Sequence, residues 1–328
     1  GIVVISGHGD PLYLARLGTF YSEGDPAGEQ GYDGQFVYYI ARDPNPQRVA
    51  PYLDVPAYRY QRILLPLLAR ALALGNLAAI PWALIIVGLA SYAGGVWAVE
   101  KLLAGWEIPR RYAYLYALWA GFLLALIVDL PEPLAYALVA GGFLALQRDK
   151  LLLGWILLGL SLFAKEVTGL FLAAVFLDYL LQRRWKHALG LFVVAGLPFS
   201  LFQLWLWSVF GQPGIGSGGA MATPFELIPF MGLIRVGFYS PLYLVAMLVV
   251  FGPTVVLPAV WGIWQAVKSW LGGERNMVVL ALLLNAVATA AMPFSTFRET
   301  GGVLRYACGS VLALLLFSAR YRQIRILN

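Results

Sequence analysis

Acidic and basic side chains recur in this sequence where polar stretches meet apolar ones. Asp33 stands in "GYDGQFVYYIARDP" between Gly31 and Gly34, two residues that allow sharp turns and close approach of the backbone. A short helix is expected around 36–42, so the Asp33 carboxylate would be presented just before it. At that place an aspartate suits three roles, which are general base, metal ligand and helix cap.

Basic side chains that suit an anionic ligand lie in two further stretches. Arg59 and Arg62 in "AYRYQRILLP" would share one face of a helix, where two guanidiniums bind a phosphate or, equally well, anchor the helix at a membrane surface. Lys165 and Glu166 in "LSLFAKEVTGLFL" separate two apolar runs. The lysine suits a phosphate head group, and a plain interfacial anchor is the competing interpretation.

Charged residues also stand at the ends of other apolar segments. Asp129 and Glu132 belong to "VDLPEPLAY", and Arg298, Glu299 and Arg305 follow a late apolar run. An ionisable residue at membrane depth is costly and marks a functional site by default. Structural ion pairs between neighbours, Lys165 with Glu166 or Asp129 and Arg298 with Glu299, are the alternative for each residue taken singly.

The composition places these residues in a membrane protein. Of 328 residues, 60% are hydrophobic and 12% are charged, and the mean hydropathy is +0.74. Soluble domains are typically about 45–50% apolar and about 25% charged. The single cysteine, Cys308, excludes a disulfide framework and any cysteine-based metal centre, and His8 and His187 are too few for histidine-rich metal sites. Phosphate-binding loops and dinucleotide fingerprints are absent.

The apolar pattern predicts an all-α, polytopic membrane protein. Residues 7–62 form a large polar first loop, and residues 63–75 form a juxtamembrane helix that lies at the interface. "GIVVIS" resembles the end of an apolar segment, so a further helix before Gly1, or a cleaved signal peptide, is expected. The nine predicted membrane helices are 78–103, 112–129, 134–147, 151–164, 168–181, 187–210, 241–267, 277–293 and 301–319.

The charges fit one orientation of this layout. With the 7–62 loop outside, the inside connections carry a net charge of +8 and the outside −2, as the positive-inside rule requires. The pI near 9.4 therefore reflects membrane orientation, and no nucleic-acid partner is expected. The outward loop 211–240 begins with the glycine-rich "GQPGIGSGG", which suits a flexible lid.

Two predicted helices are too short for a bilayer. Segments 134–147 and 151–164 would each be roughly 21 Å long, whereas the hydrocarbon core is about 30 Å thick. Polar, irregular backbone at membrane depth is tolerated only where protein buries it or water fills a cavity. The short helices therefore predict an outward cavity floored by Asp129, Glu132, Lys165 and Glu166.

The order of these features resembles the GT-C superfamily of integral membrane glycosyltransferases. The matching features are the acidic first-loop motif "GYDGQ", the amphipathic "RYQRILLPLLARALALG", the acid-containing turn in "VDLPEPLAYALVAGGFLAL" and the stretch "LGLSLFAKE". The resemblance covers roughly residues 7–182 and divides the chain into a GT-C-like module, 1–182, and variable C-terminal membrane helices, 183–328. It implies a helical bundle with about nine to ten transmembrane helices.

The resemblance also implies an activity and roles for single residues. A sugar would pass from a polyprenyl-phosphate carrier to a glycan, lipid or protein hydroxyl on the outer face of the cytoplasmic membrane, with inversion. Asp33 looks like the catalytic base, and Lys165 looks like a contact to the carrier phosphate. Asp129 and Glu132 look like the second acidic site. Together with the charge pattern of the sequence, this gives the residues expected to bind substrate, which are Lys165, Arg59, Arg62, Asp129, Glu132, Glu166, Arg298 and Arg305.

Metal dependence stays open at this point. The candidates for a divalent cation are Asp33, Asp129 and Glu132, but the first-loop motif carries one acid rather than an adjacent pair. Two other functions compete with glycosyl transfer. One is a non-catalytic scaffold subunit of a larger membrane complex, and the other is a transporter or flippase, against which the lack of an internal repeat counts.

Overall fold

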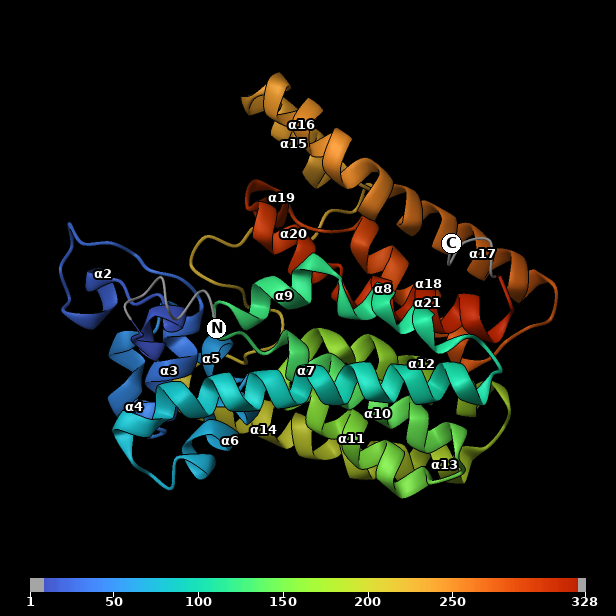
Figure 1. Cartoon of the computed structure of the whole chain (residues 1–328), viewed down its shortest axis with the longest axis horizontal. Coiled ribbons are helices and arrows are strands. Elements are labelled where there is room, and N and C mark those ends of the chain that lie inside the picture. Colours follow the sequence, from blue (N-terminus) through green and yellow to red (C-terminus); the bar gives the residue numbers. More distant parts are fainter. Residues whose placement is uncertain (1–8, 324–328) are drawn as a thin grey trace.

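The computed structural model describes residues 9–323, and every regular element in that part of the chain is helical (Figure 1). The all-α prediction is therefore confirmed for the described residues. The apolar beginning "GIVVIS" and His8 lie outside them. Within residues 9–323, four helical runs are long and apolar enough to cross a membrane: Leu77–Gly105, Trp185–Phe210, Pro241–Leu271 and Thr300–Arg320.

The predicted first loop contains short helices, as expected, and they form a packed group. The expected helix around 36–42 is α3, and the juxtamembrane helix predicted at 63–75 is α6. These helices gather at one end of the bundle, to the left in Figure 1. Their bounds are η1 Pro11–Ala15, α2 Thr19–Ser22, α3 Gly34–Arg42, α4 Pro46–Val49, η2 Ala50–Tyr52, α5 Pro56–Tyr60 and α6 Leu64–Leu72.

Aromatic and aliphatic side chains hold this first loop against the bundle. All but the last residue of α3 is buried, and Phe36, Ile40 and Leu65 share one hydrophobic cluster with Leu84 of α7 and Leu206 of α14. Burial of apolar area stabilises such packing by about 25 cal/mol per Å². The loop is therefore a fixed wall of the molecule that can position side chains.

The central helices begin with η3 (Leu77–Ala79) and α7 (Ile80–Gly105). Helix α10 (Glu132–Gln147) packs between α7 and α11 (Leu151–Ala164). Small residues permit this approach, since a Cβ on Gly142 would meet Leu158, and one on Gly154 would meet Leu146. The 16 and 14 residues of α10 and α11 confirm that both helices are short.

The predicted helix at 112–129 is wrong as a single element. The chain instead forms η4 (Arg110–Ala113), α8 (Tyr114–Ala117) and α9 (Ala120–Leu126), with extended backbone at Trp119. Tertiary contacts explain the break. The Trp119 indole Nε1 donates to the Leu304 carbonyl at 2.9 Å, and Gly121 lies directly against the same carbonyl. Hydropathy alone does not reveal such a contact.

The remaining predicted helices are found close to their expected places. Two of them contain π-helical turns, η6 and η7, each next to a proline that cannot donate a backbone hydrogen bond. Helices α15 and α16 project from the bundle in Figure 1. The bounds are α12 Gly169–Leu181, α13 Trp185–Leu191, η6 Phe192–Gly196, α14 Leu197–Phe210, α15 Met231–Tyr239, α16 Pro241–Phe251, η7 Gly252–Val256, α17 Leu257–Leu271, α18 Met277–Ala290, α19 Phe294–Arg298, α20 Thr300–Tyr306 and α21 Cys308–Arg320.

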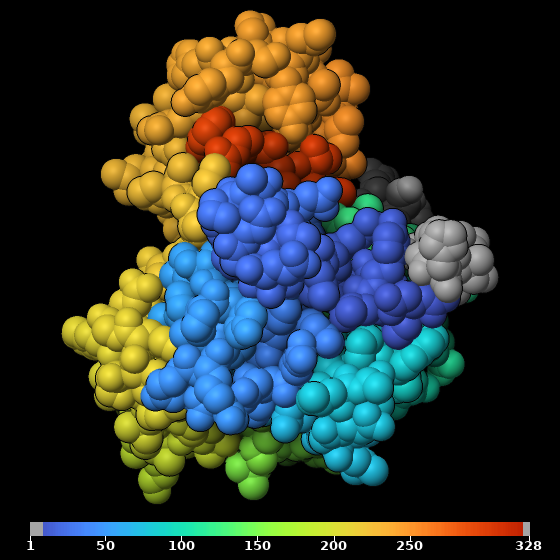
Figure 2. Space-filling model, turned by 90° about the vertical axis from the view of Figure 1, so that its left-hand side faces the viewer, coloured from blue at the N-terminus to red at the C-terminus, as the bar shows by residue number. Residues whose placement is uncertain are grey.

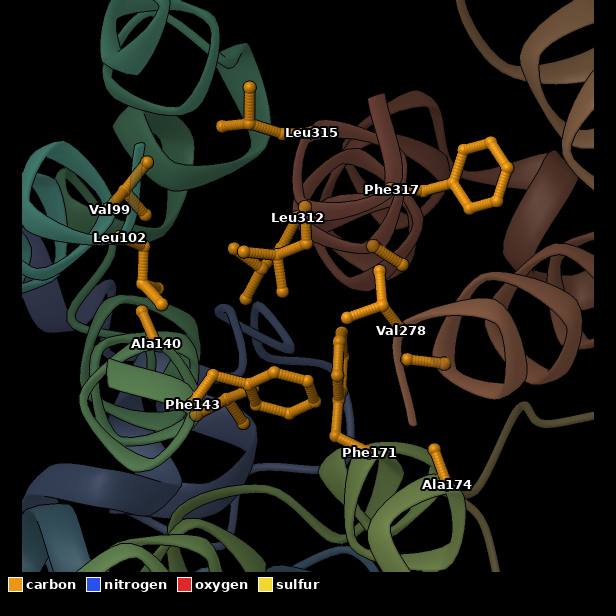
Figure 3. Packing of buried hydrophobic residues seen from close by; sticks show 14 of the residues in the cluster. Val99, Leu102, Ala140, Phe143, Phe171, Ala174, Val278, Leu312, Leu315 and Phe317 are labelled. Carbon is orange, nitrogen blue, oxygen red and sulfur yellow. The ribbon is translucent and has the colours of Figure 1, made fainter. Parts of the chain in front are cut away.

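The main core lies where the early and late helices meet. Phe143 of α10, Phe171 of α12, Val278 of α18 and Leu312 of α21 are buried and face one another (Figure 3). Helix α18 packs against α12, α17 and α21. The two halves of the sequence therefore share one core and form one bundle.

Gly121 offers a test of the α9–α20 contact. A Cβ there would lie 2.1 Å from the Leu304 oxygen, so we expect Gly121→Ala to lower the free energy of unfolding by about 1–3 kcal/mol. The matched control is Gly94→Ala in α7, where a Cβ meets nothing within 4 Å and alanine favours the helix by up to about 1 kcal/mol.

The single cysteine supplies the readout. Cys308 is buried, so the temperature at which it reacts with a thiol-specific dye in detergent reports unfolding. Equal melting temperatures for the two variants would contradict the close α9–α20 packing.

Candidate functional site

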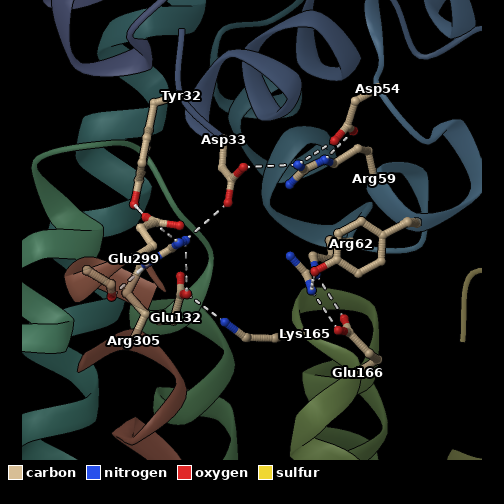
Figure 4. A network of polar contacts seen from close by, with 12 residues as sticks. Tyr32, Asp33, Asp54, Arg59, Arg62, Glu132, Lys165, Glu166, Glu299 and Arg305 are labelled. Carbon is tan, nitrogen blue, oxygen red and sulfur yellow. Dashed lines mark hydrogen bonds and ion pairs between the residues drawn. The ribbon is translucent and has the colours of Figure 1, made fainter. Parts of the chain in front are cut away.

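Charged side chains converge at the end of the bundle that carries the first loop (Figure 4). They come from five separate stretches of the sequence and lie within contact distance of one another as paired cations and carboxylates. We call this set the ion cluster. It consists of Arg59, Arg62, Lys165 and Arg305 with Asp33, Asp54, Glu132, Glu166 and Glu299.

Asp33 lies between two guanidiniums. Its Oδ1 is 3.0 Å from Arg59, and its Oδ2 is 3.2 Å from Arg305. It precedes α3 but makes no capping hydrogen bond with its side chain, so the helix-cap role is wrong. Burial would raise the pKa of Asp33, but Arg59 and Arg305 outweigh it and hold the pKa well below its usual range.

Arg59 and Arg62 do not point at one shared position. Arg59, at the end of α5, bridges Asp33 and Asp54, with its Nε 2.7 Å from the Asp54 Oδ1. Arg62 instead forms a two-point pair with Glu166, at 2.6 Å and 2.9 Å. Both guanidiniums are nearly enclosed, with 10% and 13% of their side chains exposed. They therefore bind carboxylates in this structure, and would bind a phosphate only by exchanging partners.

Lys165 pairs with Glu132, not with either acid expected from the sequence. The Lys165 Nζ lies 2.5 Å from the Glu132 Oε1, and Glu132 is 1% exposed. Glu132 is the first residue of α10, and Lys165 follows the last residue of α11. The two short helices therefore end at one buried ion pair, which explains how charge is tolerated at the ends of apolar helices.

Arg305 of α20 joins the late part of the sequence to the early part. It lies 3.2 Å from Asp33, 3.8 Å from Glu132 and 3.3 Å from Glu299. The expected pair of Glu299 with Arg298 is wrong, because Glu299 instead pairs with Arg305 and accepts a hydrogen bond from the Tyr32 hydroxyl. Arg298 is exposed and lies outside the ion cluster.

Two members of the site were missed at the level of sequence. Asp54 is one of seven acids in the first loop, and nothing in its spacing sets it apart. Tyr32 lies beside Asp33, and the Arg305 guanidinium lies 5.3 Å from the centre of its ring. The tyrosine next to the acidic motif was the available signal, but a tyrosine in an aromatic loop is equally consistent with packing.

Asp129 is separate from the ion cluster. It lies in the turn between α9 and α10, with left-handed backbone at φ 50°. Its side chain is 5% exposed, and its Oδ2 has no hydrogen-bond partner among the described atoms. Burial raises the pKa of Asp129 to about 7. Over residues 9–323, no three His, Cys, Asp or Glu side chains are grouped to hold a metal ion, so Asp33, Asp129 and Glu132 do not form a three-ligand site.

Two cavities adjoin the Tyr32–Asp33 pair, one lined by Tyr32 and the other by Asp33. A small pocket of about 20 Å³, the volume of a single water, is lined by Asp33, Arg59, Arg62 and apolar residues of α3. An open cleft of about 970 Å³ is lined by Tyr32, Glu299 and the segment that begins at Asp10. Neither cavity is lined by Asp129, Glu132, Lys165 or Glu166, so neither of the two is the outward cavity expected over the short helices.

The glycine-rich loop covers one edge of the ion cluster. The Ala220 N–H donates to the Asp54 Oδ2 at 3.1 Å, and a Cβ on Gly219 would lie 3.1 Å from the Arg59 guanidinium. Gln203 of α14 holds the start of the loop by accepting from the Gly214 and Ile215 N–H groups, both at 2.9 Å. The loop lies where the predicted lid would lie.

Comparison of the chain with protein-family models, with curated proteins and with solved structures gives no match.

The Lys165–Glu132 pair can be tested by a double-mutant cycle. Lys165→Met leaves the buried Glu132 carboxylate without its nearest cation, and we expect a loss of about 3–5 kcal/mol in the free energy of unfolding. Lys165→Met combined with Glu132→Gln removes the uncompensated charge, and we expect it to regain at least half of that loss. The measurement is the temperature at which Cys308 becomes reactive.

Arg110→Gln is the control for this cycle. Arg110 pairs with Glu100 at 3.1 Å, but its side chain is 63% exposed, and exposed pairs contribute no more than about 1 kcal/mol. A Lys165→Met variant as stable as Arg110→Gln would contradict the buried pair.

Removing the charge of Asp129 is expected to increase the stability of the folded chain in a pH-dependent way. Because burial raises its pKa in the folded state, the protonated Asp129 side chain contributes to the free energy of unfolding. This contribution is complete below the unfolded pKa of about 4 and is lost as the pH rises towards 7. We expect the free energy of unfolding of Asp129→Asn to equal that of the native chain near pH 4 and to exceed it above pH 7, by up to about 4 kcal/mol. Tryptophan fluorescence on heating at each pH measures the difference.

Asp149→Asn is the matched control, because Asp149 has the same left-handed backbone, at φ 58°, but is exposed. We expect it to change stability by no more than about 0.5 kcal/mol at either pH. A pH-independent effect of Asp129→Asn would show that the Asp129 carboxylate is hydrated.

Proposed function

We propose that this chain is a GT-C-type membrane glycosyltransferase that moves a sugar from a polyprenyl-phosphate carrier to an acceptor hydroxyl. The observation that carries the proposal is the position of the Asp33 carboxylate between Arg59 and Arg305. Arg305 also contacts Glu132, which pairs with Lys165. A base beside several enclosed cations is the arrangement that transfer from a phosphate-linked donor requires. Five predicted site residues from distant parts of the sequence meet there.

The charges suggest how the site would respond to the donor. An incoming phosphate would draw Arg59 and Arg305 towards its own oxygens, as guanidiniums bind phosphates at two points. Asp33 would then lose the neighbours that hold its pKa down, and its basicity would rise where the acceptor is bound. The substrate itself would therefore activate the base.

The chemical step follows from these roles. Asp33 takes the proton of the acceptor hydroxyl as the acceptor oxygen attacks the anomeric carbon, and the bond from that carbon to the phosphate oxygen breaks. The bonding electrons leave with the polyprenyl phosphate, whose charge Arg59, Arg305 and Lys165 stabilise. A single direct displacement inverts the anomeric carbon.

The membrane setting supports the same activity. The ion cluster lies at one end of the helical bundle (Figures 1 and 4), where a lipid-anchored phosphate would lie at the bilayer surface. We propose that the helices between the four long runs complete a bundle of nine to ten membrane segments. The charge pattern of the loops supports placing the ion cluster on the extracytoplasmic side of the cytoplasmic membrane.

One observation favours a second function. Each cation of the ion cluster is already paired with a carboxylate, and the adjoining pocket has room for about one water. A closed cluster of this kind suits a non-catalytic scaffold subunit of a membrane complex, in which the charges only fix the helix ends. Turnover of a lipid-linked sugar distinguishes the two.

Asp33→Asn tests the catalytic proposal. Arg59 keeps Asp54 and Arg305 keeps Glu299 as partners, so we expect the variant to fold. We expect release of farnesyl phosphate from a panel of farnesyl-phosphohexoses, with hydroxylated acceptors present, to fall by about 10²–10⁴ because the base is lost.

Asp43→Asn is the control, since Asp43 pairs with Arg48 on the surface. We expect it to turn over donors at the native rate. Native turnover by Asp33→Asn would remove Asp33 from the base role, and a native chain that binds the donors without turnover would favour the scaffold.

A further inference from the structure

The open cleft is a separate space with its own walls. The segment from Asp10 to Tyr32 forms one side, and the end of α9 with the start of α20 forms the other. In Figure 2 the blue N-terminal segment and the red segment of α19 and α20 lie next to each other on the same face. At about 970 Å³ the cleft has the size of a small-molecule site.

The lining of the cleft combines tyrosine rings with an excess of carboxylates. Asp10 and Glu29 contribute two negative charges and Arg16 one positive charge, and the third acid, Glu299, is paired with Arg305. The Arg16 guanidinium lies 4.3 Å from the centre of the Tyr13 ring. Such a surface repels anions, offers hydrogen-bond acceptors to hydroxyl and ammonium groups, and presents ring faces to an apolar C–H surface.

The cleft adjoins the ion cluster through a chain of contacts. The Tyr32 hydroxyl donates to Glu299, Glu299 pairs with Arg305 at 3.3 Å, and Arg305 pairs with Asp33 at 3.2 Å. Tyr32 lines the cleft, and the next residue, Asp33, lines the small pocket beside Arg59. The cleft therefore carries the exposed acids Asp10 and Glu29, whereas the charges that line the pocket are paired with one another or with neighbouring carboxylates.

We propose that the cleft binds a saccharide without negative charge, with preference for an amino sugar whose ammonium group pairs with the cleft carboxylates. Ring stacking on Tyr13 and hydrogen bonds to Glu29 and Glu299 hold the sugar. Its identification as the acceptor rests on the proposed function, because Tyr32, which lines the cleft, is the residue next to Asp33 in the chain. Binding of the sugar itself does not depend on that function.

Three trisaccharides of equal length and different charge test the proposal on the whole chain in detergent. They are a glucosamine trimer, cellotriose and trigalacturonate, with binding measured by calorimetry at pH 6, where the amines are protonated. We expect the glucosamine trimer to bind about tenfold more tightly than cellotriose, the factor that corresponds to about 1.4 kcal/mol. Trigalacturonate is expected to bind at least tenfold more weakly than cellotriose.

Substitutions then locate the binding. We expect Glu29→Gln to reduce the tenfold preference for the amino sugar at least threefold, and Tyr13→Ala to weaken both the cationic and the neutral trimer. Glu23→Gln is the control, because Glu23 is an exposed acid of the same segment outside the cleft. Equal affinity for trigalacturonate and the glucosamine trimer, no binding of any trimer, or equal effects of Glu29→Gln and Glu23→Gln would each overturn the proposal.

The experiment separates this inference from the proposed function. Binding of the glucosamine trimer without any turnover of lipid-linked donors supports the cleft and counts against glycosyl transfer. Turnover of such donors by a chain that binds none of the trimers overturns the cleft assignment and leaves the transferase proposal standing.

Discussion

The cost of burying charge governs this structure. Glu132 and Lys165 are 1% and 7% exposed, and the ends of two apolar helices meet at their contact. An isolated charge in such surroundings costs several kcal/mol, so each must find a partner of opposite sign. Arg305 extends the pairing to Asp33 and ties α20 to the first loop. The positions of the first loop, α10, α11 and α20 are thus mutually dependent.

The same constraint shapes the chemistry that the site can perform. Asp33 is a weak proton acceptor while Arg59 and Arg305 hold it, and neither arginine is free to bind an external anion until a carboxylate releases it. In this paired state the Asp33 carboxylate and the two cations neutralise one another. The cleft beyond Tyr32 is a separate surface that carries the exposed acids Asp10 and Glu29.

The local hydropathy pattern was enough to predict most of the helices. Contacts between residues distant in the sequence determine where that pattern fails and how the site residues are paired. Runs such as 151–164 are apolar throughout, and the helix Leu151–Ala164 follows directly. The break at Trp119 depends on the Leu304 carbonyl, 185 residues away, and is invisible to hydropathy. The residue types of the site, such as Asp33 and Lys165, were predicted, but their partners were not. Lys165 pairs with Glu132 rather than with a neighbour in the sequence, and the Asp129 Oδ2 has no hydrogen-bond partner among the described residues.

The contact between Asp33 and Arg305 spans 272 residues. In the order of synthesis Arg305 follows Asp33 by 272 residues, so the first loop is made before its late partner exists. Until then Asp33 has Arg59 alone, and Glu132 has Lys165 alone. Closing so long a loop is entropically costly, so this contact forms late in folding. A polypeptide that ends before α20 keeps the ion pairs of Arg59, Arg62 and Lys165 but lacks the three that Arg305 makes with Asp33, Glu132 and Glu299.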